Sequence, residues 1–405
     1  MVTYPSGWKT YSFDELFKIC PNNTLSRDKL SNRGKIGDIH YGDILVKYGP
    51  VLSAGDEIPK ILPGYEPPDK ALLQTNDVVV ADTAEDETVG KIVQVGEIPF
   101  PLAGGLHTIV CRPLVPTAAG YLGYYMNSRE YHDQLLPYIT GIKVSSISRA
   151  SIRRTELHIP ASIREQEAIV EAIESFDGYL SGLAALIEKK RAVRSGAVEE
   201  LMGGRTRVDG FAGRWAEAPL ENLCQVYDGT HQTPEYTPSG VRFVSVENIP
   251  DIYSSQKFIS KQAYASNFKV YPEKGDLLMT RIGDIGTPCI VSRDEPVAYY
   301  VSLALLKHIR IDSAFLYYYI MGRDFQNELD SRTLHHATPQ KINKGEIGKC
   351  VVRYPEEVAE QRAAAAVLSD MDGEISALAQ EREKLLQIRE GVVDGLLTGR
   401  VRIKG

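Results

Sequence analysis

Two stretches of the sequence are copies of one segment. Residues 160–208 read PASIREQEAIVEAIESFDGYLSGLAALIEKKRAVRSGAVEELMGGRTRV, and residues 355–403 read PEEVAEQRAAAAVLSDMDGEISALAQEREKLLQIREGVVDGLLTGRVRI. The copies are related by a constant offset of 195 residues, need no gap, and are identical at 18 of 49 positions. An internal duplication of this length decides the architecture before any shorter motif does.

Each copy has the residue pattern of a long helix that pairs with another helix, with apolar residues at alternating spacings of four and three. The seam of the first copy comprises Ile169, Ile173, Phe176, Leu180, Leu183, Ile187, Arg194, Ala197 and Leu201. Each copy begins with a Pro just before the expected helix, and Gly204 or Gly399 closes that helix, as helix boundaries favour. About 38 residues of helix would span roughly 57 Å. We therefore expect two long antiparallel helices that form a coiled coil.

Four basic residues interrupt this seam: Lys190, Arg194, Arg382 and Arg389. Their alkyl stems can cover apolar surface while the charges reach solvent or pair with neighbouring glutamates. The candidate glutamates are Glu188, Glu199 and Glu383. The alternative is that the basic residues control the register of the helix pair.

The duplication divides the chain into globular and helical segments in alternation. We predict globular domains at residues 1–159 and 209–354, and helical spacers at residues 160–208 and 355–405. Trp8 and Trp215 begin the two domains at similar sequence contexts. Such a chain can relate its halves by a pseudo-twofold axis, like a symmetric dimer in one polypeptide. It is also nearly circular, so we expect its last residues to lie near Trp8.

The globular segments mix strand-like runs with short helical patterns. The runs are 44–46, 78–80, 91–95, 108–110, 241–246, 277–280, 289–291 and 302–306. Tyr-rich helical patterns cover 117–137 and 313–329. Because strands and helices do not alternate regularly, the predicted fold class is α+β, with two globular α/β domains.

Charge is distributed unevenly along this acidic chain, whose net charge is −7. Residues 138–154 contain four basic residues and no acid, and residues 331–349 are also rich in Arg and Lys. The two basic loops hold equivalent places before the two helices. A solvated charge run is the simpler explanation for one loop, but two matched loops favour contact with nucleic acid.

Several classes of function lack sequence support. Neither a phosphate-binding GxxxxGK[ST] loop, nor a GxGxxG after a strand, nor the Asn-Pro-Pro-aromatic tetrapeptide of amino-methyltransferases occurs. The five Cys and eight His have no metal-ligand spacing. With no 18-residue apolar stretch and no basic leader, we expect a cytoplasmic protein without a membrane span. The pattern favours a recognition scaffold without catalytic residues or a metal.

Four motifs of the second domain carry a resemblance to a known family. They are DGTHQTP at 228–234, FVSVENI at 243–249, GDLLMTRIGDIG at 275–286 and YYVSLALL at 299–306. They resemble a target recognition domain of a type I restriction-modification specificity subunit, and IHYGDIL at 39–45 resembles another branch of that domain. The helix signatures, Pro160 with Glu165-Gln166 and Pro355 with Glu360-Gln361, are similar to the conserved regions of this family.

The resemblance implies a DNA-binding subunit that is not an enzyme itself but is required for both modification and restriction. Each recognition domain would read one half of a bipartite, asymmetric target in double-stranded DNA, and the helices would set the spacer. One turn of B-DNA, about 34 Å, is compatible with such a helix pair. Two methyltransferase subunits would dock on the helices and bring S-adenosylmethionine, and translocase-nuclease subunits would bring ATP and Mg. No cofactor is expected on this chain.

Loop position and side-chain chemistry suggest the DNA contacts. Lys143, Arg149, Lys341 and Lys344 are predicted to bind phosphates. Thr230, His231, Gln232, Thr233 and Arg281 are predicted to reach base edges, where Gln suits adenine and Arg suits guanine. In the first domain we expect His40 and Tyr41 to hold comparable places at the DNA. The acidic loop 84–88 is expected in the place of residues 280–283. Ser145, Ser146 and Asn343 complete the candidate set.

Two other functions remain open at this stage. A self-contained DNA methyltransferase or nuclease with diverged motifs would act as the purified chain alone. A coiled-coil adaptor would not bind DNA with or without a methyltransferase subunit. The resemblance favours the specificity subunit over both.

Overall fold

The computed structural model describes residues 4–141 and 143–403. The ends of the first and last predicted segments, and residue 142 in the first basic loop, lie outside the described residues. The chain divides into two compact units: unit 1 is Met1–Leu183 with Glu381–Gly405, and unit 2 is Ala184–Gln380. Each unit holds one globular domain and part of both long helices. We call residues 4–160 the first domain and residues 209–355 the second domain.

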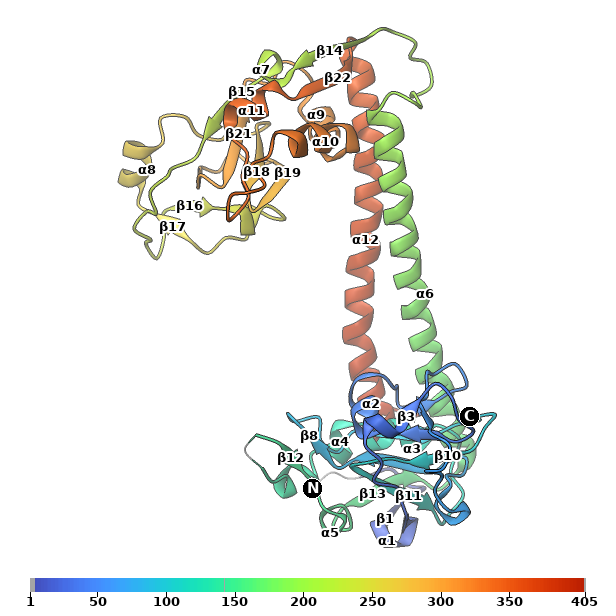
Figure 1. Cartoon of the computed structure of the whole chain (residues 1–405). Helices are drawn as coiled ribbons and strands as arrows, with labels where there is room; N and C mark the ends of the chain where they lie inside the picture. Colours follow the sequence, from blue (N-terminus) through green and yellow to red (C-terminus); the bar gives the residue numbers. More distant parts are fainter. Residues whose placement is uncertain (1–3, 142, 404–405) are drawn as a thin grey trace. The chain divides into compact units, whose positions relative to one another are not determined.

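The two long helices are α6 (Ile163–Met202) and α12 (Val358–Leu397), each of 40 residues. In unit 1, Tyr179 Oη donates to Glu381 Oε1 at 3.1 Å, and Asp177 pairs with Arg389. In unit 2, Lys190 Nζ lies 2.5 Å from Glu374 Oε1, and Arg194 pairs with Asp372. The helices therefore run antiparallel within each unit, as the green and red ribbons show (Figure 1), and the predicted helix pair is confirmed.

The predicted apolar seam is buried along most of its length. Its buried members are Ile169, Ile173, Leu180, Leu183, Ile187 and Leu201. At their ends the helices also enter the domain cores. Ile169 and Leu396 pack into the first-domain core, and Leu201 and Leu368 into the second. Burial against a domain explains why these helices need little intrinsic amphipathicity beyond the seam.

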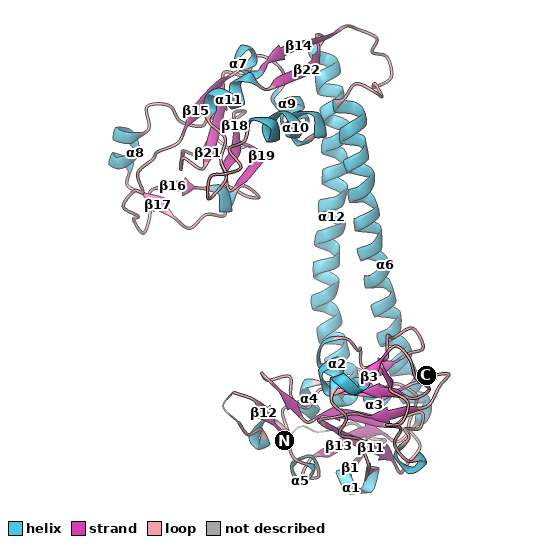
Figure 2. Cartoon of the chain, in the orientation of Figure 1, coloured by secondary structure: helices cyan, strands magenta, loops and turns pink. Residues whose placement is uncertain are grey.

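The described residues of the first domain form four small sheets, and short helices lie among the strands (Figure 2). A five-stranded sheet has the order β2 (Phe17–Cys20), β11 (Thr108–Pro113), β7 (Val78–Ala81), β9 (Ile92–Val95) and β5 (Val51–Leu52). A four-stranded sheet has the order β10 (Leu102–Gly104), β4 (Gly37–Ile39), β6 (Lys60–Ile61) and β3 (Leu30–Ser31). Two further pairs are β1 (Trp8–Ser12) with β13 (Glu156–Pro160), and β8 (Thr83–Ala84) with β12 (Ser145–Ser146). The helices are α1 (Phe13–Leu16), α2 (Tyr41–Val46), α3 (Tyr121–Met126), α4 (Arg129–His132) and α5 (Arg149–Ile152), with 3-10 turns at Arg27–Lys29, Asp69–Ala71 and Leu136–Tyr138.

The second domain repeats much of this topology. A four-stranded sheet has the order β15 (Gln225–Asp228), β21 (Leu303–Lys307), β18 (Leu277–Ile282) and β19 (Asp284–Ile290). A three-stranded sheet has the order β17 (Phe258–Ile259), β16 (Val241–Val244) and β20 (Val297–Tyr299), and β14 (Trp215–Pro219) pairs with β22 (Val351–Pro355). The helices are α7 (Leu220–Leu223), α8 (Lys261–Asn267), α9 (Ser313–Met321), α10 (Arg323–Arg332) and α11 (Lys344–Lys349), with a 3-10 turn at Val246–Asn248.

The strand register shows that the two domains share one framework. Trp8 lies opposite Pro160 in the first domain, and Trp215 lies opposite Pro355 in the second. Each Trp ring also covers the Gly that ends a long helix: a Cβ built on Gly399 would lie 3.1 Å from Trp8, and one on Gly204 would lie 3.3 Å from Trp215. Within the described residues, the end of the second long helix therefore lies beside Trp8, as expected.

One strand prediction is wrong. Residues 44–46 belong to α2 instead of a strand. The three apolar residues do not alternate with polar ones, and the His40 side chain caps the helix by accepting from Gly42 N at 3.3 Å. Ile44 is buried while Val46 is 81% exposed, as expected for different faces of a helix. The other predicted runs contain or overlap strands.

Candidate nucleic-acid interface

Three segments of the second domain converge around Asp228, the last residue of β15. Arg281 Nη1 donates to the Asp228 carboxylate, and Lys344 Nζ lies 3.9 Å from the same carboxylate. Arg281 Nε also donates to Ile342 O at 3.1 Å. The backbone reinforces this contact, because Ile342 N donates to Arg281 O at 3.0 Å. Segments 228–233, 281–283 and 340–344 therefore form one surface.

The predicted contacts on this surface divide by exposure. His231, Gln232, Thr233, Lys341, Asn343 and Lys344 are exposed, and Thr230 is half-buried. Arg281 is only 6% exposed. Since its guanidinium is occupied by Asp228 and by Ile342 O, Arg281 holds the loops together instead of offering donors to a guanine. The exposed set remains available for phosphates and base edges.

An equivalent convergence occurs in the first domain. Ile147 N donates to Asp82 O at 2.9 Å, next to the pairing of Ser146 with Thr83. Arg149 Nη2 donates to Asn22 Oδ1 at 2.9 Å, and Asn22 Nδ2 donates to Gly105 O at 3.1 Å. Lys143 and Arg149 are exposed, and Ser145 and Ser146 are half-buried. The structure thus brings the basic loop to the turns at 22 and 105.

His40 and Tyr41 lie beside this surface but differ in role. His40 is 5% exposed and caps α2, and burial, with the nearby Arg27 charge, lowers its pKa to about 4. The imidazole is therefore neutral at pH 7 and engaged by Gly42 N. Tyr41 is half-buried, with its ring centroid 4.7 Å from that of His40 and 5.2 Å from that of His107. Tyr41 and His107 are the members of this aromatic group with exposed surface.

The hydrogen bonds align the two surfaces residue by residue. Ile147 and Ile342 are related by the 195-residue offset, and they donate to Asp82 O and Arg281 O respectively. Asp82 therefore holds the framework position of Arg281. The expected equivalence of the acidic loop 84–88 with residues 280–283 is wrong, because residues 280–283 match residues 81–84, which begin three residues earlier. Loop 84–88 follows this position and has diverged.

Two residues of the first surface were not singled out by the sequence. Asn22 follows β2 and fastens Arg149, and His107 stands at a positive φ of 55° in the turn before β11. The Gly104-Gly105 pair that precedes His107 was the available signal. A Cβ on Gly105 would lie 2.3 Å from Asp38 Oδ1, so the close approach of this turn to the sheet requires glycine.

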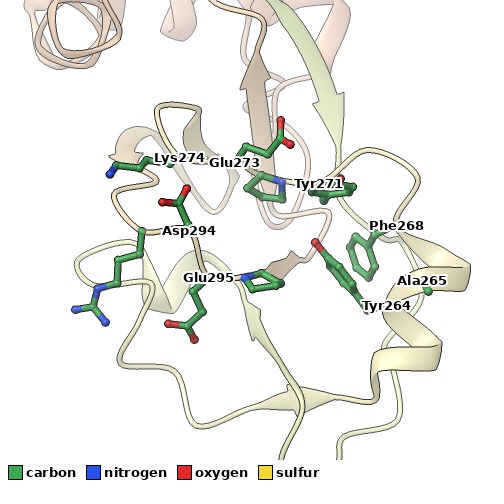
Figure 3. A pocket seen from close by; sticks show the side chains of 11 residues that line it. Tyr264, Ala265, Phe268, Tyr271, Glu273, Lys274, Asp294 and Glu295 are labelled. Atoms are coloured by element: carbon green, nitrogen blue, oxygen red, sulfur yellow. The ribbon is translucent and has the colours of Figure 1, made fainter.

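A cavity of about 510 Å³ opens elsewhere in the second domain (Figure 3). Tyr264, Phe268 and Tyr271 line one side of it, and Glu273, Asp294 and Glu295 line the other. None of the described lining residues belongs to the candidate DNA contacts. The candidate interface is therefore a surface of loops and not this cavity.

The described residues contain no group of three or more His, Cys, Asp and Glu side chains arranged to hold a metal ion. Among the helices that the structure describes, none combines the length and the hydropathy needed to traverse a lipid bilayer.

Comparisons with known proteins agree with the motifs. Residues 5–189 match the family model of the type I restriction modification DNA specificity domain. The chain is 20% identical over 304 residues to the type I restriction enzyme MjaVIII specificity subunit of Methanocaldococcus jannaschii, covering 70% of each chain. It is 19% identical to the putative type I restriction enzyme MjaX specificity subunit of the same organism, covering 99% of this chain and 95% of that one.

Solved structures share the fold at low identity. The S subunit of a type I restriction-modification system from M. genitalium aligns with a TM-score of 0.53 at 15% identity over 96% of both chains. The HsdS subunit from Thermoanaerobacter tengcongensis aligns with a TM-score of 0.54 at 17% identity over 98% of both. A chain from a study of complex assembly and conformational transition of the type I R-M system aligns with a TM-score of 0.64 at 17% identity, covering 98% of this chain.

Proposed function

We propose that this chain is a specificity subunit of a type I restriction-modification system, as its similarity to such subunits suggests, and that each globular domain reads one half of a bipartite, asymmetric DNA target. The observation that carries the proposal is the shared framework with diverged loops. Each domain holds a basic residue beside the end of an equivalent strand. Arg149 contacts Asn22 after β2 in the first domain, and Lys344 lies near Asp228 at the end of β15 in the second. The side chains around that point differ between the domains, so two different half-sites can be read.

Within each surface we assign side chains by exposure and chemistry. Lys143, Arg149, Lys341 and Lys344 bind phosphates, which makes the affinity depend on salt. Tyr41 in the first domain and residues 230–233 in the second contact base edges. Ser145, Ser146 and Asn343 flank these contacts and can donate to phosphate oxygens. His40 and Arg281 stabilise the loops through hydrogen bonds within the protein and do not contact bases.

The paired helices fix the gap between the half-sites and carry two methyltransferase subunits. The methyltransferases supply S-adenosylmethionine and the active sites, while translocase-nuclease subunits supply ATP and Mg. The chain itself contributes recognition and no catalysis, and both modification and restriction depend on it. The acidic net charge of −7 agrees with a surface that meets protein partners as well as phosphate.

The test is to map methylated adenines in a host that carries this chain with its methyltransferase subunit. We expect one asymmetric two-part motif with a fixed gap. A continuous palindrome, or no methylation that depends on this chain, would contradict the proposal. Methyl transfer or cleavage by the purified chain alone would establish the competing enzymatic function instead.

A further inference from the structure

The structure identifies the partners of two seam arginines. In unit 2, Arg194 Nε donates to Asp372 Oδ1 at 2.8 Å and Nη2 donates to Oδ2 at 3.0 Å. Tyr318 Oη, from α9 of the second domain, donates to the same carboxylate at 2.8 Å. Arg194 of α6 therefore pairs with a residue of α12 instead of with Glu199 on its own helix. Tyr318 links this ion pair to the second domain.

Unit 1 contains the duplicate of this pair. Arg389 Nε and Nη2 donate to the two oxygens of Asp177, the second bond at 2.9 Å. Asp177 and Asp372 are related by the 195-residue offset, and so are Arg194 and Arg389. Tyr124 of α3 lies near this pair. Burial and the Glu174 charge raise the pKa of the Tyr124 hydroxyl most, and the charges of Asp177 and Arg389 also act on it. Each unit therefore has one bidentate Asp–Arg pair of the same origin.

Both pairs belong to a single register of the antiparallel helices. An apolar seam of Leu, Ile and Ala repeats every heptad, so it does not strongly distinguish one register from the next. A slip of one heptad would place Arg194 opposite Ala365 or Ala379, and Arg389 opposite Val170 or Ala184. Such a slip would leave both guanidiniums facing apolar residues.

The burial of these side chains makes that mismatch costly. The side chain of Arg194 is 16% exposed and that of Arg389 is 29% exposed. A partly buried charge without its partner loses solvation that nothing replaces. The bidentate geometry adds directional specificity that an apolar contact lacks. The two pairs are therefore suited to select the register between the helix ends, which themselves pack into the domain cores.

We propose that the pairs Asp177–Arg389 and Asp372–Arg194 set the register of α6 on α12, and that this register determines the length of the DNA gap that the complex accepts. The inference rests on the proposed function for its DNA consequence. A slip of one heptad moves one helix by roughly 10 Å along the other. At about 3.4 Å per base pair, a slip that carries one domain along with its helix would change the gap by about three base pairs.

The experiment uses the full chain with its methyltransferase subunit and a DNA library that carries both half-sites at every gap from zero to fifteen base pairs. Single charge reversals, Asp177→Arg and Arg389→Asp, are compared with the double swap D177R/R389D. The matched control is the double swap E188R/R191E, because Glu188 and Arg191 form an exposed pair on one helix at 2.8 Å. Sequencing of methylated library members gives the gap distribution.

We expect wild type and the control swap to methylate a single gap length. Each single reversal should shift or spread the gap by about three base pairs, or reduce methylation at the original gap at least tenfold, and the double swap should restore the original gap. Single reversals that keep the wild-type gap and rate would overturn the inference. If the reversals do not fold, the double swap decides, and its failure to restore the gap has the same meaning.

A DNA-independent measurement separates this inference from the proposed function. Thermal unfolding of the four chains, wild type, two reversals and swap, gives the coupling between Asp177 and Arg389. Strong coupling together with no gapped target for wild type would refute the proposed function and retain the pairing. A single gapped target together with absent coupling would refute the inference alone.

Discussion

The two globular domains share a framework but differ in how charge is placed at one equivalent position. In the second domain this position holds Arg281, which is buried and joined to Asp228 and Ile342 O. In the first it holds Asp82, whose side chain is 27% exposed and lies 3.4 Å from His107. The same backbone hydrogen bond from Ile342 or Ile147 survives the change. The backbone framework is therefore retained, while the charge of the side chain at this position can reverse.

The largest expected effect separates these two positions. Arg281→Ala should lower the free energy of unfolding of the second domain by about 4 kcal/mol, because it leaves the Asp228 carboxylate without its buried partner. Asp82→Ala should cost less than about 1 kcal/mol, since its pair with His107 is partly exposed. Urea unfolding of both variants measures the contrast. Equal losses would show that the two positions are not used differently.

The two domains also differ at Asp38 on β4. The equivalent residue of the second domain is Phe243 on β16, and each of the two lies opposite an alanine on the neighbouring parallel strand. Burial raises the pKa of Asp38 to about 6 against the hydrogen bond from Asn23. Between about pH 4 and 6 the folded state keeps a proton that the unfolded chain has released. The first domain should therefore lose stability as pH rises through this window, by about 3 kcal/mol.

Asp38→Asn is the variant that checks this pH dependence. It should remove the loss in the first domain and leave the second domain unaffected. Hydrogen exchange, corrected for its intrinsic pH dependence, reads the domains separately. A first domain whose protection has the same pH profile in wild type and D38N would refute the assignment.

Side chains that read bases should act on one half-site only. Gln232→Ala should reduce methylation of the cognate target roughly tenfold and relax the sequence preference in the second half-site, because a bidentate contact to adenine is lost. Tyr41→Ala should relax the first half-site instead. Methylation of libraries randomised in one half at a time distinguishes the two. Changes in both halves from either variant would mean that the domains do not read independently.

The smallest effect is expected from the phosphate contacts. Lys341→Ala and Lys143→Ala should weaken binding by a few-fold for all sequences and reduce the slope of log affinity against log salt by about one each. Titration of the complex with DNA at several salt concentrations supplies the slope. An unchanged slope would remove that lysine from the interface.

The duplication made much of the fold predictable from one sequence. The heptad seam, the Pro and Gly boundaries and the proximity of the chain end to Trp8 follow from local patterns that both copies repeat. Residues 44–46 were wrongly predicted as a strand because a short apolar run fits a strand or a helix equally well. The His40 cap favours the helix, but it forms only in the folded loop. Asp177 and Asp372 were not predicted as partners of the seam arginines, because each lies on the other long helix from its arginine. The spacing within one helix does not show which residues of two helices face each other.

The sequence could place two basic loops before the helices, but it could not show what their side chains contact within the protein. In the structure these loops join turns of their own domains. Arg281 looked like a base contact because it follows a strand in a polar loop, but its burial depends on Asp228, 53 residues away in sequence. Asn22 and His107 were missed for the same reason, since tertiary contacts bring them to the surface.

We propose that each domain reads its half-site independently on a common framework. The most direct test replaces residues 209–354 by a second copy of residues 1–159, joined at the equivalent Trp and Pro positions, and maps the methylated target. We expect a gapped inverted repeat of the first half-site with the wild-type gap. A target that retains the wild-type second half-site would contradict it.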